Sequence, residues 1–361
     1  MIPLVKVGFP EKEVLMPALE TTLYSGMIGE GEYVYEFEKA FAQKFLLGDG
    51  LAFSSGTAAL HAALVLAGVG PGDEVITTSM TAEPTNTTIL QIGATPVFAD
   101  VDVLSGNLEP TSVESKIGPH TKAILVVHYA GFPARLDELH ELAVTHDIKL
   151  IEDCAHALGS NYRGKSIGTI GDFAIFSFQA IKHMTTVDGG FLIFKDKNLT
   201  RTAKKFRWFG LEKGVPRTEV DITSQGYKYN MNNVTATIGL KQLECIDGRI
   251  NKHKDNGKYY DEQIVAIPGL SVTAYEEHAD PSYWLYTVLS DDSDDVERRL
   301  GDIGVTASKL HRPNHFHSMF KPYAGELPNL TSYYARMTHI PCGWWVTADV
   351  RAKIVDALRT G

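Results

Sequence analysis

The chain has 361 residues, of which 44% are hydrophobic and 22% charged, and its formal net charge at pH 7 is −10. This length suits one large domain with a smaller one, and the acidic balance, without any Lys/Arg-rich tract, argues against nucleic-acid binding. The 3 cysteines form no disulfide or zinc pattern, residues 1–10 lack the features of a signal peptide, and no apolar run approaches the roughly 20 residues that span a bilayer. We therefore expect a cytoplasmic protein that contacts no membrane and holds no metal.

The first half of the chain alternates short apolar strands with helix-patterned segments. The expected strands are 74–78, 95–100, 123–128 and 149–153, and the expected helices are 11–25, 33–45, 57–67, 83–92 and 136–146. This alternation predicts an α/β fold with a mostly parallel sheet and helices on both faces. Residues 172–194 are predicted to add strands with short connections, as in an antiparallel or mixed sheet.

A turn of small residues, Ser54-Ser55-Gly56-Thr57, joins the apolar stretch 51–53 to the amphipathic helix expected at 57–67. The free N–H groups and the dipole of a helix start can hold a phosphate without a basic side chain. Gly56 and Thr57 are therefore candidate phosphate ligands. The alternative is an ordinary Ser/Thr helix cap.

The apolar strand at 149–153 ends in acids, and His156 follows three residues later. In open parallel sheets, ligands bind outside the carboxyl ends of the strands. A carboxylate such as Asp153 can there pair with a protonated pyridine nitrogen, which makes the ring of a bound cofactor an electron sink. The alternative is an acid that caps the next helix.

Lys182 lies on a short turn between an apolar stretch at 172–178 and another at 191–194. Desolvation on a rigid turn lowers the pKa of a lysine and leaves a nucleophilic amine. Such an amine forms a Schiff base with an aldehyde, and pyridoxal phosphate is the common biological one. Taken alone, Lys182 is more simply a surface lysine in a hairpin.

The composition changes after a helix predicted at 234–243. Strands are expected at 269–272 and 283–289, and helices at 296–301 and 348–358. We predict a large α/β domain over residues 1–244 and a smaller α+β domain over 245–361. A histidine-rich stretch, His311, His315 and His317, is expected to form a loop, which the family resemblance given below places near a substrate entrance. The acidic run 291–295 is expected to form a solvated loop that caps the next helix.

The ordered set of phosphate turn, strand-end acid and lysine resembles the DegT/DnrJ/EryC1/StrS aminotransferases, the sugar-aminotransferase branch of the fold-type I pyridoxal 5'-phosphate enzymes. The similarity covers nearly the whole chain. Further matching segments are Gly29-Glu30-Gly31, Pro71–Val75, Gly93–Phe98, Glu152–Gly159 and Gly226-Tyr227. The resemblance implies a mostly parallel seven-stranded sheet in a large domain, followed by a smaller C-terminal domain.

The resemblance also assigns roles to single residues. Lys182 would form the Schiff base and move protons, Asp153 would bind the pyridine nitrogen, and His156 would lie near the ring and its phenolic oxygen. Gly56 and Thr57 would bind the phosphate.

Ser177 would add a hydroxyl to that phosphate site. The chain departs from the family pattern at three positions. An aromatic residue that stacks on the cofactor ring is replaced by Ala82, an Asn that reaches the phosphate in the neighbouring subunit is replaced by Lys228, and an Arg two residues later is replaced by Asn230. Lys228 could serve the same phosphate by charge.

The activity implied is a two-step transfer in a homodimer whose active site lies at the subunit interface. Glutamate, or else glutamine, would give its amino group to form pyridoxamine 5'-phosphate, and a nucleotide-linked keto-sugar would receive it. Cations available for such an anionic acceptor are Lys204, Lys205, Arg207 and Arg312. Two alternatives remain: a sugar dehydratase of the same family, which usually has His in place of Lys182, and a non-catalytic regulatory relative.

Overall fold

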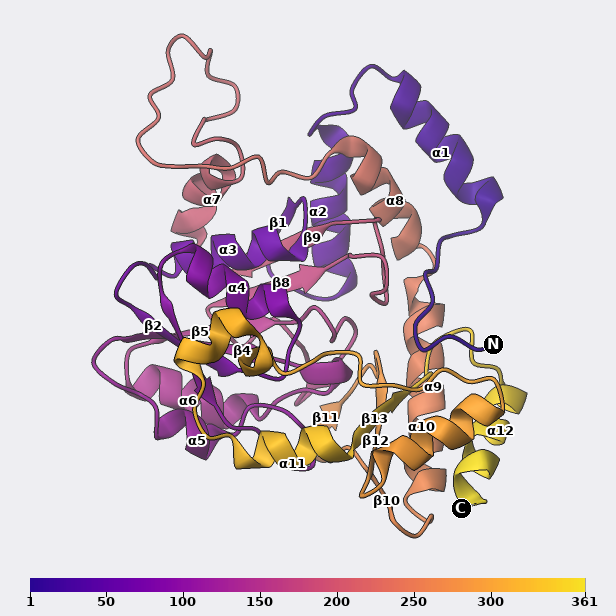
Figure 1. Cartoon of the computed structure of the whole chain (residues 1–361). Coiled ribbons are helices and arrows are strands. Elements are labelled where there is room, and N and C mark those ends of the chain that lie inside the picture. The colour runs from indigo at the N-terminus through magenta and orange to yellow at the C-terminus, as the bar shows by residue number, and fades with distance from the viewer. Residues whose placement is uncertain (361) are drawn as a thin grey trace.

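The computed structural model describes residues 1–360, and its centre is a seven-stranded sheet with the strand order β1-β9-β8-β5-β4-β2-β3 (Figure 1). The strands are β1 (Gly50–Phe53), β2 (Glu74–Thr78), β3 (Thr95–Ala99), β4 (Thr121–Val127), β5 (Lys149–Asp153), β8 (Phe173–Ser177) and β9 (Gly190–Phe194). The β2–β3, β2–β4, β4–β5 and β5–β8 pairs are parallel, and β9 is antiparallel to both of its neighbours. The mostly parallel sheet expected from the sequence is thus confirmed.

Helices cover both faces of this sheet. They are α2 (Glu32–Lys44), α3 (Gly56–Leu66), α4 (Glu83–Gln91), α5 (Pro110–Glu114), α6 (Leu136–Thr145), α7 (Thr200–Phe206) and α8 (Asn233–Leu243), whereas α1 (Lys12–Tyr24) packs against α8. Neighbouring strand residues point to opposite faces. In β4, Ile124 packs in the layer that holds α2, α6 and α8, whereas Leu125 packs in the layer that holds α3 and α7. Burial on both faces explains why these strands are continuous apolar runs.

The last third of the chain builds a second core. Its helices are α9 (Ile246–Ile264), α10 (Ser293–Asp302), α11 (Pro328–Arg336) and α12 (Ala348–Arg359), and its strands are β10 (Leu270–Val272), β12 (Tyr286–Ser290) and β13 (Met337–Ile340). These three strands form an antiparallel sheet in the order β10-β12-β13. The extreme N-terminus joins this part, because the Ile2 N–H donates to the carbonyl oxygen of Gly304 at 2.7 Å. The domain boundary at residue 245 remains a prediction.

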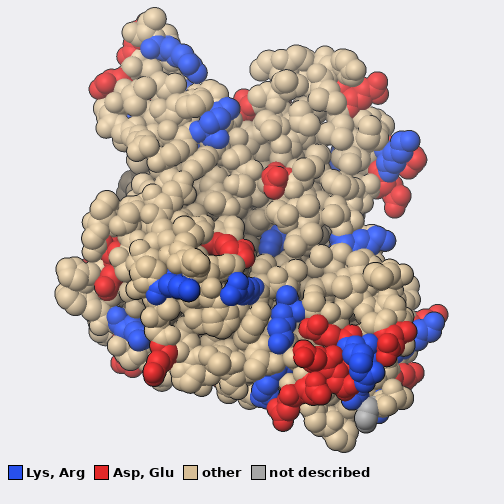
Figure 2. Space-filling view, in the orientation of Figure 1, with Lys and Arg blue, Asp and Glu red and all other residues tan. Residues whose placement is uncertain are grey.

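Three smaller features complete the fold. A separate small sheet joins β6 (Asn161–Tyr162), β7 (Lys165–Ser166) and β11 (Ala279–Asp280). Asp292, within the acidic run, caps α10, because it accepts a hydrogen bond from the Asp295 N–H at 3.0 Å. Figure 2 shows acidic and basic side chains gathered over α10. Across residues 1–360, no helix has both the length and the apolar character needed to cross a bilayer.

Two sequence predictions in the last third were wrong in detail. The strand expected at 283–289 begins only at Tyr286, and Tyr283 has a φ of 50°, which ends any extended run before it. The helix expected at 296–301 begins at Ser293, so most of the acidic run is helical.

Arg207 is buried in an ion-pair cluster and is not available to a substrate, contrary to the expectation for this cation. Its guanidinium donates to the Glu38 carboxylate and the Ala52 carbonyl oxygen, both at 2.6 Å, and to the Glu30 carboxylate at 3.0 Å. Both carboxylates are largely buried. This cluster ties the Gly29–Gly31 segment to α2, β1 and α7.

We expect Arg207→Met to lower the free energy of unfolding by about 3–5 kcal/mol, because it removes the buried cation of the cluster. Glu30 then keeps only Lys213 at 2.7 Å, and Glu38 keeps only the Ala52 N–H at 2.8 Å. Denaturant unfolding measures this loss. The control is Arg298→Met on the exposed face of α10, where the Asp302 pair at 3.3 Å is worth about 0–1 kcal/mol. Equal losses in the two variants would contradict the assignment.

Candidate active site

A cavity of about 320 Å³ lies at the carboxyl ends of the parallel strands. Val127 ends β4, Asp153 ends β5 and Ser177 ends β8, and all three line the cavity. Loops and helix starts at this edge complete it, as expected for a ligand site in a parallel α/β sheet. The cavity contains six of the seven residues that the sequence singled out: Gly56, Thr57, Asp153, His156, Ser177 and Lys182.

One end of the cavity is the start of α3. Ser55 caps this helix through a 3.0 Å hydrogen bond from the Ala58 N–H, and the first-turn N–H groups of Gly56 and Thr57 have no intrahelical partners. A Cβ on Gly56 would lie 2.8 Å from the Cβ of Ser177, so only glycine allows the helix to approach β8 this closely. The helix start and the Ser177 hydroxyl together suit a phosphate.

Asp153 is 2% exposed and accepts two hydrogen bonds, from the Thr85 hydroxyl at 2.9 Å and from the Ala155 N–H at 3.1 Å. Burial raises the pKa of this carboxyl, and the two hydrogen bonds and the charge of Lys182 oppose the rise. A cationic ring nitrogen is the partner that such a carboxylate lacks. Thr85 was not predicted, because nothing in the sequence of α4 marks one threonine among several.

Glu152, beside Asp153, serves the scaffold. Its carboxylate accepts hydrogen bonds from His128 Nε2 at 3.1 Å, from the Gly168 N–H at 2.9 Å and from the Ile170 N–H at 2.9 Å. These bonds hold the 168–171 turn against β5. The two neighbouring acids therefore divide the work, with Glu152 fixing the strand end and Asp153 lining the cavity.

Lys182 is buried on the turn that follows β8. Desolvation lowers the pKa of its amine to about 7, while the charge of Asp153 opposes the shift. Its Nζ lies 4.0 Å from the centre of the Trp284 ring, and the indole Nε1 donates to the carbonyl oxygen of Ile181 at 2.9 Å. Desolvation therefore favours the uncharged amine, as a nucleophilic lysine requires.

An aromatic wall faces Lys182. The imidazole of His156 stacks on the Trp284 ring with centroids 4.0 Å apart, and the His311 imidazole lies 5.4 Å from that of His156, within 2° of parallel. His311 comes from the histidine-rich loop that the sequence placed near a substrate entrance. The contact of Trp284 with Lys182 was not predicted, because the pattern of residues 283–289 is that of an ordinary strand.

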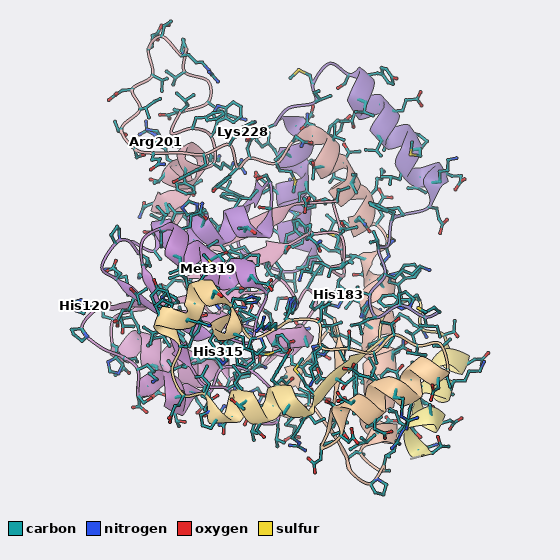
Figure 3. All side chains as sticks on the ribbon, in the orientation of Figure 1. His120, His183, Arg201, Lys228, His315 and Met319 are labelled. Carbon is teal, nitrogen blue, oxygen red and sulfur yellow. The ribbon has the colours of Figure 1, made fainter. Side chains whose placement is uncertain are left out.

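Lys228, the seventh residue singled out, does not line the cavity of its own chain. Its amine donates to the side-chain Oδ1 of Asn230 at 2.8 Å and lies 4.1 Å from the Trp208 ring centre. Figure 3 shows it at the base of the loop that follows α7, well separated from His183, the neighbour of Lys182. Ala82 does line the cavity, and its methyl group leaves space where a larger ring would stand.

The residues present fit pyridoxal phosphate. The start of α3 and Ser177 suit its phosphate, the buried Asp153 carboxylate suits a protonated ring nitrogen, and the desolvated Lys182 amine suits its aldehyde. His156 adds a buried Nδ1 atom that has no hydrogen-bond partner within residues 1–360. A polar atom of this kind is expected where a ligand supplies the partner.

Comparisons with known proteins agree with this geometry. Residues 11–359 match the DegT/DnrJ/EryC1/StrS aminotransferase family. The chain is 34% identical to the GDP-perosamine synthase of Caulobacter vibrioides, over 90% of this chain and 88% of that protein. It is 32% identical to the spore coat polysaccharide biosynthesis protein SpsC of Bacillus subtilis, over 96% of this chain and 94% of that protein.

Among solved structures, the sugar aminotransferase CalS13 of Micromonospora echinospora superposes on this chain with a TM-score of 0.96 at 34% identity, and each chain is covered completely. A match of this extent, together with the family match, settles the relationship and the fold. The chain belongs to the DegT/DnrJ/EryC1/StrS family and is a pyridoxal-phosphate-dependent aminotransferase with the fold of the type I enzymes.

Proposed function

We propose that this aminotransferase moves an amino group from glutamate to a nucleotide-linked keto-sugar through Lys182. The observation that carries the proposal is the buried Lys182 amine in one cavity with Asp153 and the start of α3. The names of the relatives support the acceptor class, since GDP-perosamine synthase and a polysaccharide biosynthesis protein are among them. The product would be an amino sugar for a surface polysaccharide or another glycosylated compound.

Pyridoxal phosphate, when bound, supplies an electron sink that lets a proton leave the carbon next to the amino group. The protein supplies the rest. With the cofactor bound, Asp153 would hold the ring nitrogen in its protonated state, the N–H groups of Gly56 and Thr57 with the Ser177 hydroxyl would hold the phosphate, and Lys182 Nζ would take up and return the proton. The desolvated amine is suited to that exchange, because its pKa of about 7 lies near working pH.

We further propose that the active site is completed in a homodimer. Lys228 does not line the cavity of its own chain, and within residues 1–360 its amine forms no ion pair with a carboxylate. The amine is therefore a suitable ligand for the phosphate in a partner's site. Loss of cofactor affinity in Lys228→Ala, with a dimer retained by light scattering, is the expected result. An unchanged affinity would remove Lys228 from the cofactor site.

The decisive experiment follows the two half-reactions separately by absorption. The purified protein loaded with pyridoxal phosphate is mixed with glutamate, with glutamine, and then with GDP-linked and dTDP-linked keto-hexoses. We expect glutamate to convert the cofactor to its amino form and a keto-sugar to restore the original spectrum. A protein that takes up no cofactor would instead support the non-catalytic alternative, and conversion by glutamine alone would correct the donor.

A further inference from the structure

The loop that carries His311 is fixed onto the edge of the cavity by a fully buried side chain. The Asn314 N–H donates to the Ser79 carbonyl oxygen and its Nδ2 donates to the Thr81 carbonyl oxygen, both at 2.8 Å. Its Oδ1 accepts from Asn86 Nδ2, also at 2.8 Å. These bonds join a loop of the last third of the chain to the β2–α4 turn, so His311 is presented from a rigid support.

The ring of His311 is partly buried, and one of its two nitrogens has no hydrogen-bond partner in the described part of the chain. Among residues 1–360, its Nε2 is a buried atom without a partner, as is Nδ1 of His156 in the parallel ring 5.4 Å away. The other histidines around the site are used: His339 bonds the Tyr129 hydroxyl at 2.9 Å, and His183 bonds the Ser282 carbonyl oxygen at 3.1 Å. Buried imidazole nitrogens without a partner also occur in His140, His278 and His317, but among residues 1–360 only those of His156 and His311 belong to rings that line the cavity.

The surroundings of His311 select the kind of group that it can bind. Burial, together with the charge of Lys182, lowers the pKa of His311 to about 3, so the ring is neutral at physiological pH. A neutral imidazole offers one donor and one acceptor. This pairing matches a hydroxyl or a ketone oxygen, whereas a phosphate or carboxylate needs a cation or several donors. The rings of Trp284 and Tyr129, which are 2% and 1% exposed, pack beside His311 at centroid distances of 6.2 and 6.3 Å and hold its ring in place.

We propose that His311 is a substrate-recognition residue that hydrogen-bonds a neutral oxygen of the acceptor sugar, next to the carbon that receives the amino group. The inference rests on the proposed function, because it presumes a keto-sugar acceptor. The proposal predicts different effects on the two substrates. The sugar oxygen binds His311, whereas glutamate, whose polar groups are charged, does not depend on His311.

The test compares His311→Phe, which keeps an aromatic ring and removes both nitrogens, with His311→Gln, which restores a donor and an acceptor. His317→Phe, on the same loop but outside the cavity lining, is the control. Each protein is loaded with pyridoxal phosphate, and the glutamate half-reaction and the half-reaction with GDP-linked and dTDP-linked keto-hexoses are timed separately. Binding of GDP-perosamine and of each amino product formed by the wild type is measured by calorimetry on the inactive Lys182→Ala protein, with and without His311→Phe.

We expect His311→Phe to lower kcat/KM for the keto-sugar by about 10–100-fold and to weaken amino-sugar binding comparably, because a buried sugar oxygen loses its partner. The glutamate half-reaction should stay within about twofold of wild type, and His311→Gln should recover part of the loss.

Three outcomes would overturn the inference. An equal loss in both half-reactions would show that His311 acts on the cofactor or the fold, and full sugar activity in His311→Phe would remove it from the substrate site. If the wild type reacts with glutamate but with neither keto-hexose, the keto-sugar acceptor of the proposed function fails, and this inference falls with it.

Discussion

Replacement of Lys182 by alanine is expected to lower the rate of the glutamate half-reaction by at least about 10⁴-fold, since it removes both the nucleophile and the proton carrier. Stopped-flow absorption at saturating glutamate measures the rate. The control is Lys122→Ala. Lys122 is an exposed lysine on β4 that does not line the cavity, so this variant should react as wild type. Retained turnover in Lys182→Ala would mean that another amine carries the reaction.

The same lysine gives the reaction of the cofactor-free protein a characteristic pH dependence. Only the uncharged amine attacks an aldehyde, and the Lys182 pKa is lowered to about 7 by desolvation. The rate at which the protein captures pyridoxal phosphate should therefore rise from acidic pH and level off above about pH 8. A rate that keeps rising toward pH 10 would show an ordinary, solvated lysine.

Replacement of Asp153 by asparagine is expected to lower kcat by about 10²–10³-fold without unfolding the protein. The amide keeps the shape of the carboxylate but cannot hold the ring nitrogen in its protonated state, so the electron sink is weakened. Because burial already raises the pKa of Asp153, the neutral amide is not expected to destabilise the fold. Steady-state kinetics and a thermal melt separate the two effects.

Thr85→Val is the graded companion of Asp153→Asn. It removes the 2.9 Å hydrogen bond to the carboxylate but leaves the charge in place. We expect a loss of about tenfold or less, in line with the removal of one hydrogen bond to a charged group. If Thr85→Val were as damaging as Asp153→Asn, the orientation of the carboxylate, and not its charge, would be the larger contribution.

The central sheet could be predicted because each of its strands has a recognisable local sequence pattern. The predicted bounds of β2 and β5 match those of the structure, since each is a short apolar run with turn residues on both sides. The helix α9 was missed although it has 19 residues. Its buried face includes His253, Asn256 and Gly257, which are polar or small and hide the helical repeat of apolar residues. Asn256 is buried because its amide donates to three carbonyl oxygens, among them that of Val346 at 3.0 Å.

The candidate site was predictable only where one segment carries both a chemical group and its support. Gly56 begins a helix, Asp153 ends a strand and Lys182 lies on the turn that follows β8, so their position at the sheet edge follows from the sequence. Trp284 contacts Lys182, and His311 lines the cavity, from the last third of the chain. A local sequence pattern cannot predict contacts between residues that lie more than one hundred positions apart.

The late position of these two residues in the chain has a consequence for how the enzyme is made. All strands of the seven-stranded sheet lie before residue 195, whereas Trp284 and His311 emerge from the ribosome well afterwards. At about 5–20 residues per second, the delay before His311 is synthesised is on the order of 10 s. During that interval Lys182 lacks the wall that shields it from water, and its amine keeps the proton that a solvated lysine holds at neutral pH. Cofactor capture is therefore expected to be a late step in the biogenesis of the protein, after Trp284 and His311 have emerged from the ribosome and packed beside Lys182.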